Sequence, residues 1–98
     1  MPRVLTAARA QVQTGRESVY LEVLGELGRR LRARGESFWL FRHPAQPGCF
    51  LEFRESAAPE RHRLCRAPDA EEAALEQRLR DIASYGTEGS VLWEEVAL

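Results

Sequence analysis

The segment from Ser37 to Glu55 constrains the fold more than any other part of this sequence. It holds two runs rich in aromatic and aliphatic residues, Ser37–His43 and Cys49–Glu55, joined by Pro-Ala-Gln-Pro-Gly. Aromatic residues favour strands, proline cannot donate to a β-ladder, and glycine tolerates a positive φ angle in a turn. The segment therefore predicts a β-hairpin whose strands pack into a core.

The N-terminal third predicts a strand followed by a helix. From Val4 to Gln13, small apolar residues alternate with increasingly polar ones, which is typical of a strand with one buried face. Thr14 and Glu17 then match a capping box, in which each side chain satisfies a backbone amide at a helix start. Apolar residues follow at helical spacing, and Gly35 supplies a stop. We expect a helix between Thr14 and Gly35.

The second half of the chain predicts another helix and a last strand. Asp69 and Glu72 form a second capping box, and an apolar stripe at helical spacing follows, made of Leu75, Leu79, Ile82 and Ala83. Tyr85–Gly89 predicts a turn, and Val91–Leu98 predicts the final strand. Residues 56–68 carry no decisive pattern, so a short helix and an ordered loop both remain open for them.

The expected order is strand, helix, strand, strand, helix, strand, which is the split βαβ arrangement of ferredoxin-like folds. The predicted fold class is α+β, with residues 1–98 as one domain. Right-handed crossovers then place the first and third strands at the centre of a four-stranded antiparallel sheet, with both helices on one face.

Alternation of side chains along the third strand gives it two distinct faces. We expect Leu51 and Phe53 to face the helices. That arrangement leaves Phe50, Glu52 and Arg54 on the opposite face of the sheet.

The face turned away from the helices is expected to be too apolar to remain in water. Trp93 of the last strand and either Trp39 or Phe38 of the second would join Phe50 there, with Arg9 of the first strand beside Glu52 and Arg54. Small domains rarely expose so much contiguous apolar surface. These 98 residues predict no further element to cover it. We therefore expect a homodimer, in which two sheets form an α/β barrel about a two-fold axis.

The composition excludes several classes of partner and chemistry. Fourteen basic and 15 acidic residues give a net charge of −1, whereas nucleic-acid binders concentrate positive charge, so no nucleic-acid partner is expected. The sequence contains no Lys, which excludes a Schiff base formed by Lys. No stretch approaches the ~18 apolar residues of a membrane helix, and no signal-peptide core is found. We expect a cytoplasmic protein with no membrane partner.

Two segments carry patterns that go beyond the order of elements. In VLTAARAQVQTGRESVYLEVLGEL a strand runs into a Gly-Arg-Glu helix start followed by an aromatic residue and leucines, and in FLEFRESAAPERH an acidic strand end precedes His62. With these segments the chain resembles the dimeric α/β-barrel proteins of the antibiotic biosynthesis monooxygenase-like type. Stress-responsive and EthD-like barrel proteins share much of this pattern. The resemblance implies a ferredoxin-like dimeric barrel and one of three roles: oxidation of aromatic polyketides without metal or flavin, haem degradation, or no known activity. It also puts His62 near a position where such proteins commonly carry a His.

Five side chains are candidates to line a small-molecule pocket inside the expected barrel: Arg9, Trp39, Glu52, Arg54 and Trp93. Apolar walls with a few convergent polar groups are typical of ligand sites. The alternative is an ion-pair network at the interface, because a buried unpaired charge is strongly destabilising. Both interpretations remain open at the level of the sequence.

His43 and His62 are the candidate catalytic residues, because a neutral imidazole can take a proton from a phenolic substrate near neutral pH. The alternative is that both are ordinary surface histidines. Cys49 and Cys65 are expected to be reduced thiols. The spacing of these two histidines and two cysteines lacks the paired short loops of structural zinc sites, so we predict no metal site.

The sequence thus predicts a homodimeric barrel protein that binds a small aromatic molecule. The leading hypothesis is a monooxygenase that acts on an aromatic or quinol-like substrate and needs no cofactor. The competing hypothesis is a non-catalytic dimerisation or interaction module. An interior with unfilled volume beside a His or Trp favours the first hypothesis, and an interior packed solid by Arg–Glu pairs and aromatic side chains favours the second.

Overall fold

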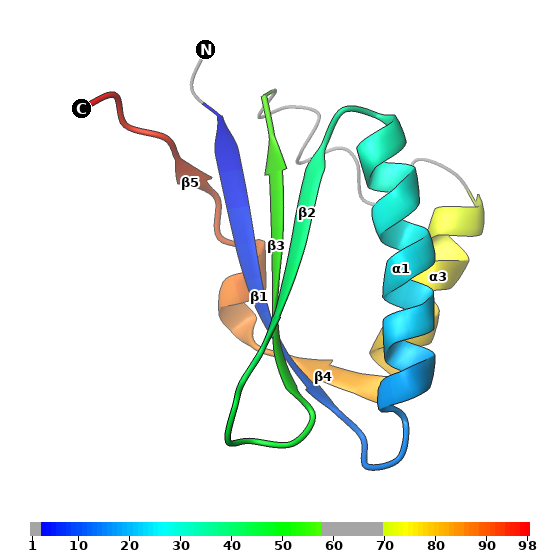
Figure 1. The fold of residues 1–98 in the computed structure, drawn as a ribbon. Helices are drawn as coiled ribbons and strands as arrows, with labels where there is room; N and C mark the ends of the chain where they lie inside the picture. Colours follow the sequence, from blue (N-terminus) through cyan, green and yellow to red (C-terminus); the bar gives the residue numbers. More distant parts are fainter. Residues whose placement is uncertain (1–2, 58–69) are drawn as a thin grey trace.

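The computed structural model describes residues 3–57 and 70–98 of the chain. In this part of the chain, two α-helices cover one face of a five-stranded antiparallel sheet (Figure 1). The elements in chain order are β1 (Val4–Val12), α1 (Glu17–Ala33), β2 (Ser37–Arg42), β3 (Cys49–Ser56), α3 (Ala70–Ile82), β4 (Ala83–Tyr85), the 3-10 helix η1 (Thr87–Ser90) and β5 (Trp93–Glu94).

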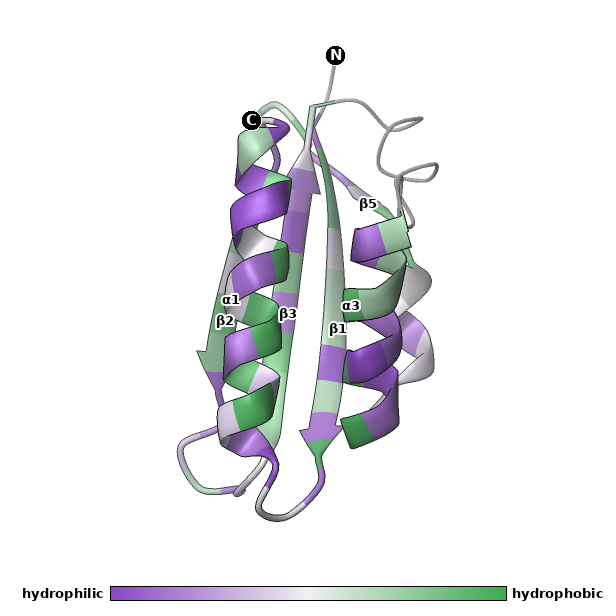
Figure 2. Ribbon diagram, turned by 90° about the vertical axis from the view of Figure 1, so that its right-hand side faces the viewer, coloured by the Kyte–Doolittle hydropathy of each residue, from purple (hydrophilic) through white to green (hydrophobic). Residues whose placement is uncertain are grey.

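The strand order of the sheet is β2-β3-β1-β4, and β5 pairs with β1 as well. The first and third strands are therefore central, as a ferredoxin-like fold requires, and the predicted fold class is confirmed. Figure 2 shows α1 in front of β2 and β3, with α3 beside it on the side of β1. The opposite face of the sheet carries neither of these helices (Figure 1).

The last part of the chain differs from the prediction of one strand over Val91–Leu98. The segment β4 follows α3 without a loop and pairs with the C-terminal end of β1, whereas β5 is two residues long and pairs near the start of β1. Between them η1 packs closely on β1, where a Cβ atom at Gly89 would lie 2.9 Å from the Cβ atom of Ala8. Gly89 therefore allows η1 to approach β1 closely, and the two short strands β4 and β5 take the place of the expected single strand.

The start of α1 also differs from the expected capping box. Thr14 and Gly15 lie in a turn, Gly15 has a φ of +81°, and Arg16 takes the N-cap position without a side-chain cap. Gly35, with a φ of +82°, donates its amide to the Arg32 carbonyl just after the helix, so the predicted stop is confirmed. The helix α3 begins at Ala70, while the expected cap at Asp69 and the segment 58–68 lie outside the described residues.

The main core lies between the sheet and the two helices. Its helical part is the expected stripe of α1 and α3, and in β2 the side facing the helices is the one that carries Phe38 and Leu40. The buried residues of this core are Ala10, Val12, Tyr20, Val23, Leu24, Leu27, Leu31, Phe38, Phe50, Leu75, Leu79, Ile82 and Ala83.

The faces of β3 are the reverse of those expected from its sequence. Phe50 and Glu52 are 2% and 5% exposed and point toward the helices, whereas Leu51 and Phe53 lie on the open face. Both faces of this strand carry apolar residues, so its own sequence does not decide which face is turned toward the helices. The pairing with β1 decides this, because Phe50 lies opposite Ala10, whose side chain is fully buried under the helices.

Replacing Gly48 by Ala is expected to destabilise the fold, because Gly48 closes the β2–β3 hairpin with a φ of +73° and a new Cβ atom would lie 2.8 Å from the Val12 carbonyl oxygen. Such strained positions cost about 1–3 kcal/mol each. The control is Gly25→Ala, at a helical position where a new Cβ atom would meet only the tip of the Arg29 side chain, at 4.0 Å, and which should stabilise by up to about 1 kcal/mol. Urea unfolding of both variants measures the two effects, and equal stabilities would contradict this assignment.

Candidate functional site

The sheet separates the five candidate ligand residues into two groups. Glu52 and Arg54 lie on the helix-covered side of β3, whereas Arg9, Trp39 and Trp93 lie on the open face. The expectation that Arg9 lies beside Glu52 and Arg54 is wrong, because these positions have opposite side-chain directions in the β1–β3 ladder. One pocket therefore cannot contain all five side chains.

The most unusual group on the helix-covered side is the Glu52 carboxylate. The hydroxyl of Tyr20 donates to Glu52 Oε2 at 2.6 Å, and the hydroxyl of Tyr85 donates to the same oxygen at 2.7 Å. These three residues come from α1, β3 and β4, so the cluster exists only in the folded chain. A buried carboxylate held by two neutral donors is the central feature of the candidate site.

Local structure explains how both tyrosines reach Glu52. Tyr20 lies on the buried stripe of α1 and packs against Phe50 in a tilted arrangement, with ring centroids 4.9 Å apart. Tyr85 lies opposite Ala10, and the side chain of Ala10 points to the helix side of the sheet. Neither tyrosine is among the site residues expected from the sequence. A tyrosine within a buried stripe is a usable signal, since a buried phenol hydroxyl normally finds a partner.

The environment of the cluster shifts its proton affinities. Desolvation by burial raises the pKa of Glu52 above the usual value of a glutamic acid, and the hydrogen bonds from the tyrosines and the charge of Arg54 oppose this rise only in part. Burial, followed by the nearby negative charge of Glu52, raises the pKa values of Tyr20 and Tyr85 as well. Glu52 is thus a stronger base than an exposed carboxylate.

Arg54 does not neutralise Glu52 through a direct ion pair. Its guanidinium donates to Glu76 of α3 at 3.2 Å, and both side chains of that pair are partly buried. Glu76 in turn contributes to the raised pKa of Glu52 by charge repulsion. Arg54 is therefore paired with Glu76 within the helix-covered layer and not at the expected interface, whereas the direct partners of the buried Glu52 carboxylate in residues 3–57 and 70–98 are tyrosines.

The open face of the sheet forms a separate aromatic surface. Trp39, Phe41 and Trp93 are 45%, 57% and 59% exposed, and Phe53 packs edge-on against Phe41 with ring centroids 5.5 Å apart. We call Trp39, Phe41, Leu51, Phe53 and Trp93 the open-face residues. Phe38 and Phe50 do not belong to this surface, because both are buried under the helices.

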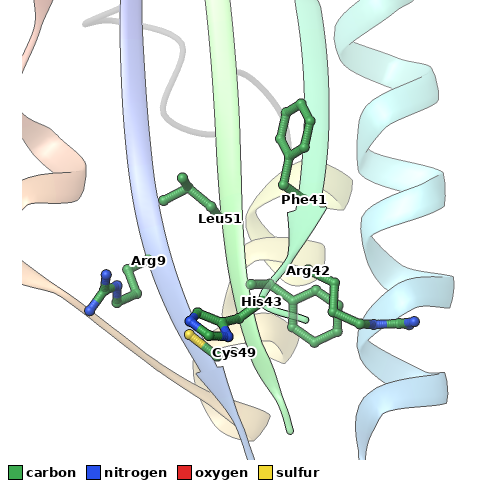
Figure 3. A pocket seen from close by; sticks show the side chains of 7 residues that line it. Arg9, Phe41, Arg42, His43, Cys49 and Leu51 are labelled. Carbon is green, nitrogen blue, oxygen red and sulfur yellow. The ribbon is translucent and has the colours of Figure 1, made fainter. Parts of the chain in front are cut away.

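A small hollow of about 150 Å³ lies at one end of the sheet, and Phe41, His43, Cys49 and Leu51 contribute to its lining (Figure 3). Arg9 also borders the hollow, but its side chain points away from that of His43 (Figure 3). The Nδ1 atom of His43 accepts hydrogen bonds from the backbone amides of Ala45 and Gln46, each at 3.1 Å. Only its Nε2 atom is thus available to a ligand.

The second candidate catalytic residue, His62, lies outside the described residues, and so does Cys65. Within residues 3–57 and 70–98, no group of three or more His, Cys, Asp or Glu side chains is arranged to hold a metal ion. None of the helices in this part of the chain is long and apolar enough to cross a membrane.

No protein-family model matches this sequence, and the curated proteins contain no significant match. Solved structures do match. SnoaB from Streptomyces nogalater, a cofactor-independent oxygenase, is 14% identical with a TM-score of 0.75, covering 100% of this chain and 95% of SnoaB. An antibiotic biosynthesis monooxygenase is 15% identical with a TM-score of 0.72, covering 100% and 99%.

A NIPSNAP family protein from Agrobacterium tumefaciens also matches, with 17% identity and a TM-score of 0.61, covering 98% of this chain and 91% of that protein. At such identities the likeness shows the fold alone. The chain has the ferredoxin-like fold of antibiotic biosynthesis monooxygenase-type proteins, so the resemblance noted in the sequence is confirmed at the level of the fold.

Replacing Glu52 by Gln is expected to remove a pH dependence of stability. Because folding raises the pKa of Glu52, the folded chain still holds a proton that the unfolded chain has released. The free energy of unfolding therefore falls as the pH rises from about 4.3, the unfolded value, through the folded pKa. At pH values above the folded pKa, each pKa unit by which folding raises the pKa of Glu52 lowers the free energy of unfolding by about 1.4 kcal/mol.

Urea titrations of wild type and E52Q at several pH values measure this effect. The two proteins should be similarly stable below the window, and E52Q should be equal or more stable above it. The exposed Glu22→Gln on α1 is the matched control and should follow the wild type. An E52Q protein that is less stable than wild type at neutral pH would contradict the assignment.

Proposed function

We propose that this protein is a small-molecule-binding oxygenase that acts on an aromatic, quinol-like substrate without a bound cofactor, and that it works as a homodimer. The enzymatic part is carried by one observation, the buried Glu52 carboxylate held by Tyr20 and Tyr85. The fold, which it shares with the cofactor-independent oxygenase SnoaB, supports the same class of activity.

A contribution to the stability of the fold does not explain why the Glu52 carboxylate is buried. A buried charge without a direct ion pair is costly, and apolar residues of similar volume often stabilise a protein as well or better. Arg54, the nearest cation in its strand, is engaged with Glu76. Titratable groups whose pKa is shifted by burial are concentrated at functional sites. The cluster therefore favours a role in chemistry.

A cofactor-free oxygenase has to draw electrons from its own substrate. With naphthohydroquinone, one atom of O2 forms a bond to a ring carbon and the other leaves as water with two hydrogens of the substrate. The product is a hydroxynaphthoquinone, and the atoms and electrons balance. The residues of the chain would bind and orient the quinol and hold the proton that it releases.

Incubation with naphthohydroquinone under isotopically labelled O2 tests this activity by mass spectrometry. The folded protein should yield hydroxynaphthoquinone with one labelled oxygen, faster than heat-unfolded protein does. Spontaneous oxidation gives the unsubstituted quinone, which separates the background from turnover. Absence of labelled hydroxyquinone above the background would overturn the enzymatic proposal.

The homodimer rests on the open-face residues. Trp39, Phe41 and Trp93 expose aromatic rings on this one face of the sheet, and exposed apolar groups gathered on one face mark interaction sites. A second copy would offer the same surface about a two-fold axis, which is the commonest symmetry of soluble oligomers. The same observation favours the competing function, a non-catalytic dimerisation module, and the oxidation assay distinguishes the two.

Trp39→Glu and Phe41→Glu are expected to break the homodimer, because each would bury an unpaired negative charge in the interface between the open faces of the two copies. Analytical ultracentrifugation should give twice 11.1 kDa for the wild type and 11.1 kDa for each variant. The control is Leu21→Glu, an exposed apolar residue on α1 at the other side of the molecule, which should stay dimeric. A folded wild type that is monomeric at micromolar concentration would refute the homodimer.

A further inference from the structure

We propose that Glu52 is the catalytic base of this protein, which accepts the proton of an acidic aromatic hydroxyl on its Oε1 atom, and that Tyr20 and Tyr85 are positioning residues for this carboxylate. The inference rests on the proposed function and goes beyond it, since it assigns the proton-transfer step to one atom. It also gives the substrate class: a phenol, quinol or enol whose hydroxyl can approach the helix-covered side of β3.

The geometry of the hydrogen bonds leaves one oxygen of Glu52 for a ligand. Both tyrosine hydroxyls donate to Oε2, at 2.6 and 2.7 Å, and Oε1 accepts no hydrogen bond from residues 3–57 or 70–98. A carboxylate oxygen can accept more than one hydrogen bond, and a buried carboxylate gains from each donor. A substrate hydroxyl is such a donor, and it can also give up its proton.

The two tyrosines restrain the position of one carboxylate oxygen. They approach from different elements, α1 and β4, so Glu52 Oε2 is held by two hydrogen bonds from two parts of the fold. Tyr20 is fully buried and further restrained by its contact with Phe50. A preorganised base loses less free energy to reorientation when the substrate binds.

The proton affinity of Glu52 suits this role, because burial raises its pKa toward the pH range in which a general base is most effective. Its neighbours Ala8 and Leu40 in the adjacent strands are uncharged. The titratable or charged groups that face the cluster from the described elements are Tyr20 of α1, Arg54 of β3, Glu76 and Arg80 of α3, and Tyr85 of β4.

The proposed step balances. The O–H bond of the substrate breaks and an O–H bond forms on Glu52 Oε1, while the electron pair remains on the substrate as a phenolate. The phenolate is the electron-rich species that reacts with O2. The proton on Glu52 leaves with the second oxygen atom of O2 as water, which returns the carboxylate to its starting state.

The experiment compares wild type, E52Q and the control Glu22→Gln in naphthohydroquinone oxygenation over a range of pH. Wild type should show an acid limb, in which kcat/KM rises with pH as Glu52 loses its proton. E52Q should lack this limb and lose about 100- to 10,000-fold in kcat/KM, the range typical of general base catalysis. The control should match the wild type in both respects.

Tyr20→Phe and Tyr85→Phe test the positioning role and remain informative if E52Q fails to fold. Each removes a hydrogen bond that lowers the pKa of Glu52, so the acid limb should move to higher pH. NMR titration of the glutamate carboxyl signals should show the same shift without any turnover. Phe variants that leave both the limb and the NMR titration unchanged would overturn the positioning role.

The outcomes separate this inference from the proposed function. Labelled product from wild type together with equal activity of E52Q would refute Glu52 as the base and leave the oxygenase proposal standing. Absence of labelled product from the wild type would overturn both. Loss of activity in E52Q with normal folding and an abolished acid limb is the result we expect.

Discussion

The antiparallel pairing of β1 with β3 is the constraint on which the other features depend. Eight residue pairs, from Val4 opposite Ser56 to Gln11 opposite Cys49, join the two central strands. This register sets the side of the sheet on which every side chain of both strands lies. A shift by one residue would move Glu52 to the open face and Leu51 and Phe53 under the helices, and the candidate site would disappear.

Polar groups in the helix-covered layer are of two kinds. Arg34, at the end of α1, binds Glu36 and Glu72 and so ties α1 to α3 through paired charges. Within residues 3–57 and 70–98 Glu52 forms no ion pair, and its partners there are the hydroxyls of Tyr20 and Tyr85. A paired charge is satisfied in the folded state, whereas a carboxylate bound by neutral donors keeps a raised proton affinity. The contrast explains why the Glu52 cluster, and not the Arg34 cluster, is suited to chemistry.

The two faces of one thin sheet thus offer different chemistry within a single small domain. The covered face combines an apolar core with a base, and the open face presents aromatic rings to solvent. Side-chain alternation places the two sets back to back, so a partner bound to the open face would press on the same strands that hold Glu52. The strand β3 thus carries Glu52 on one face and Leu51 and Phe53 on the other.

The sequence alone determined the fold class, the hairpin, the buried stripes of both helices and the presence of an aromatic surface, because these follow from local periodicity and turn residues. The faces of β3 were predicted wrongly, because this strand has apolar residues on both of its faces. The final strand was also predicted wrongly, because the end of the chain pairs with β1 in two short segments, separated by η1, which approaches β1 closely at Gly89. Of the five candidate ligand residues, the sequence named Glu52 but gave it the wrong neighbours. Only tertiary structure brings Tyr20 and Tyr85 to that carboxylate, because residues 32 and 33 positions away meet through sheet register and helix packing.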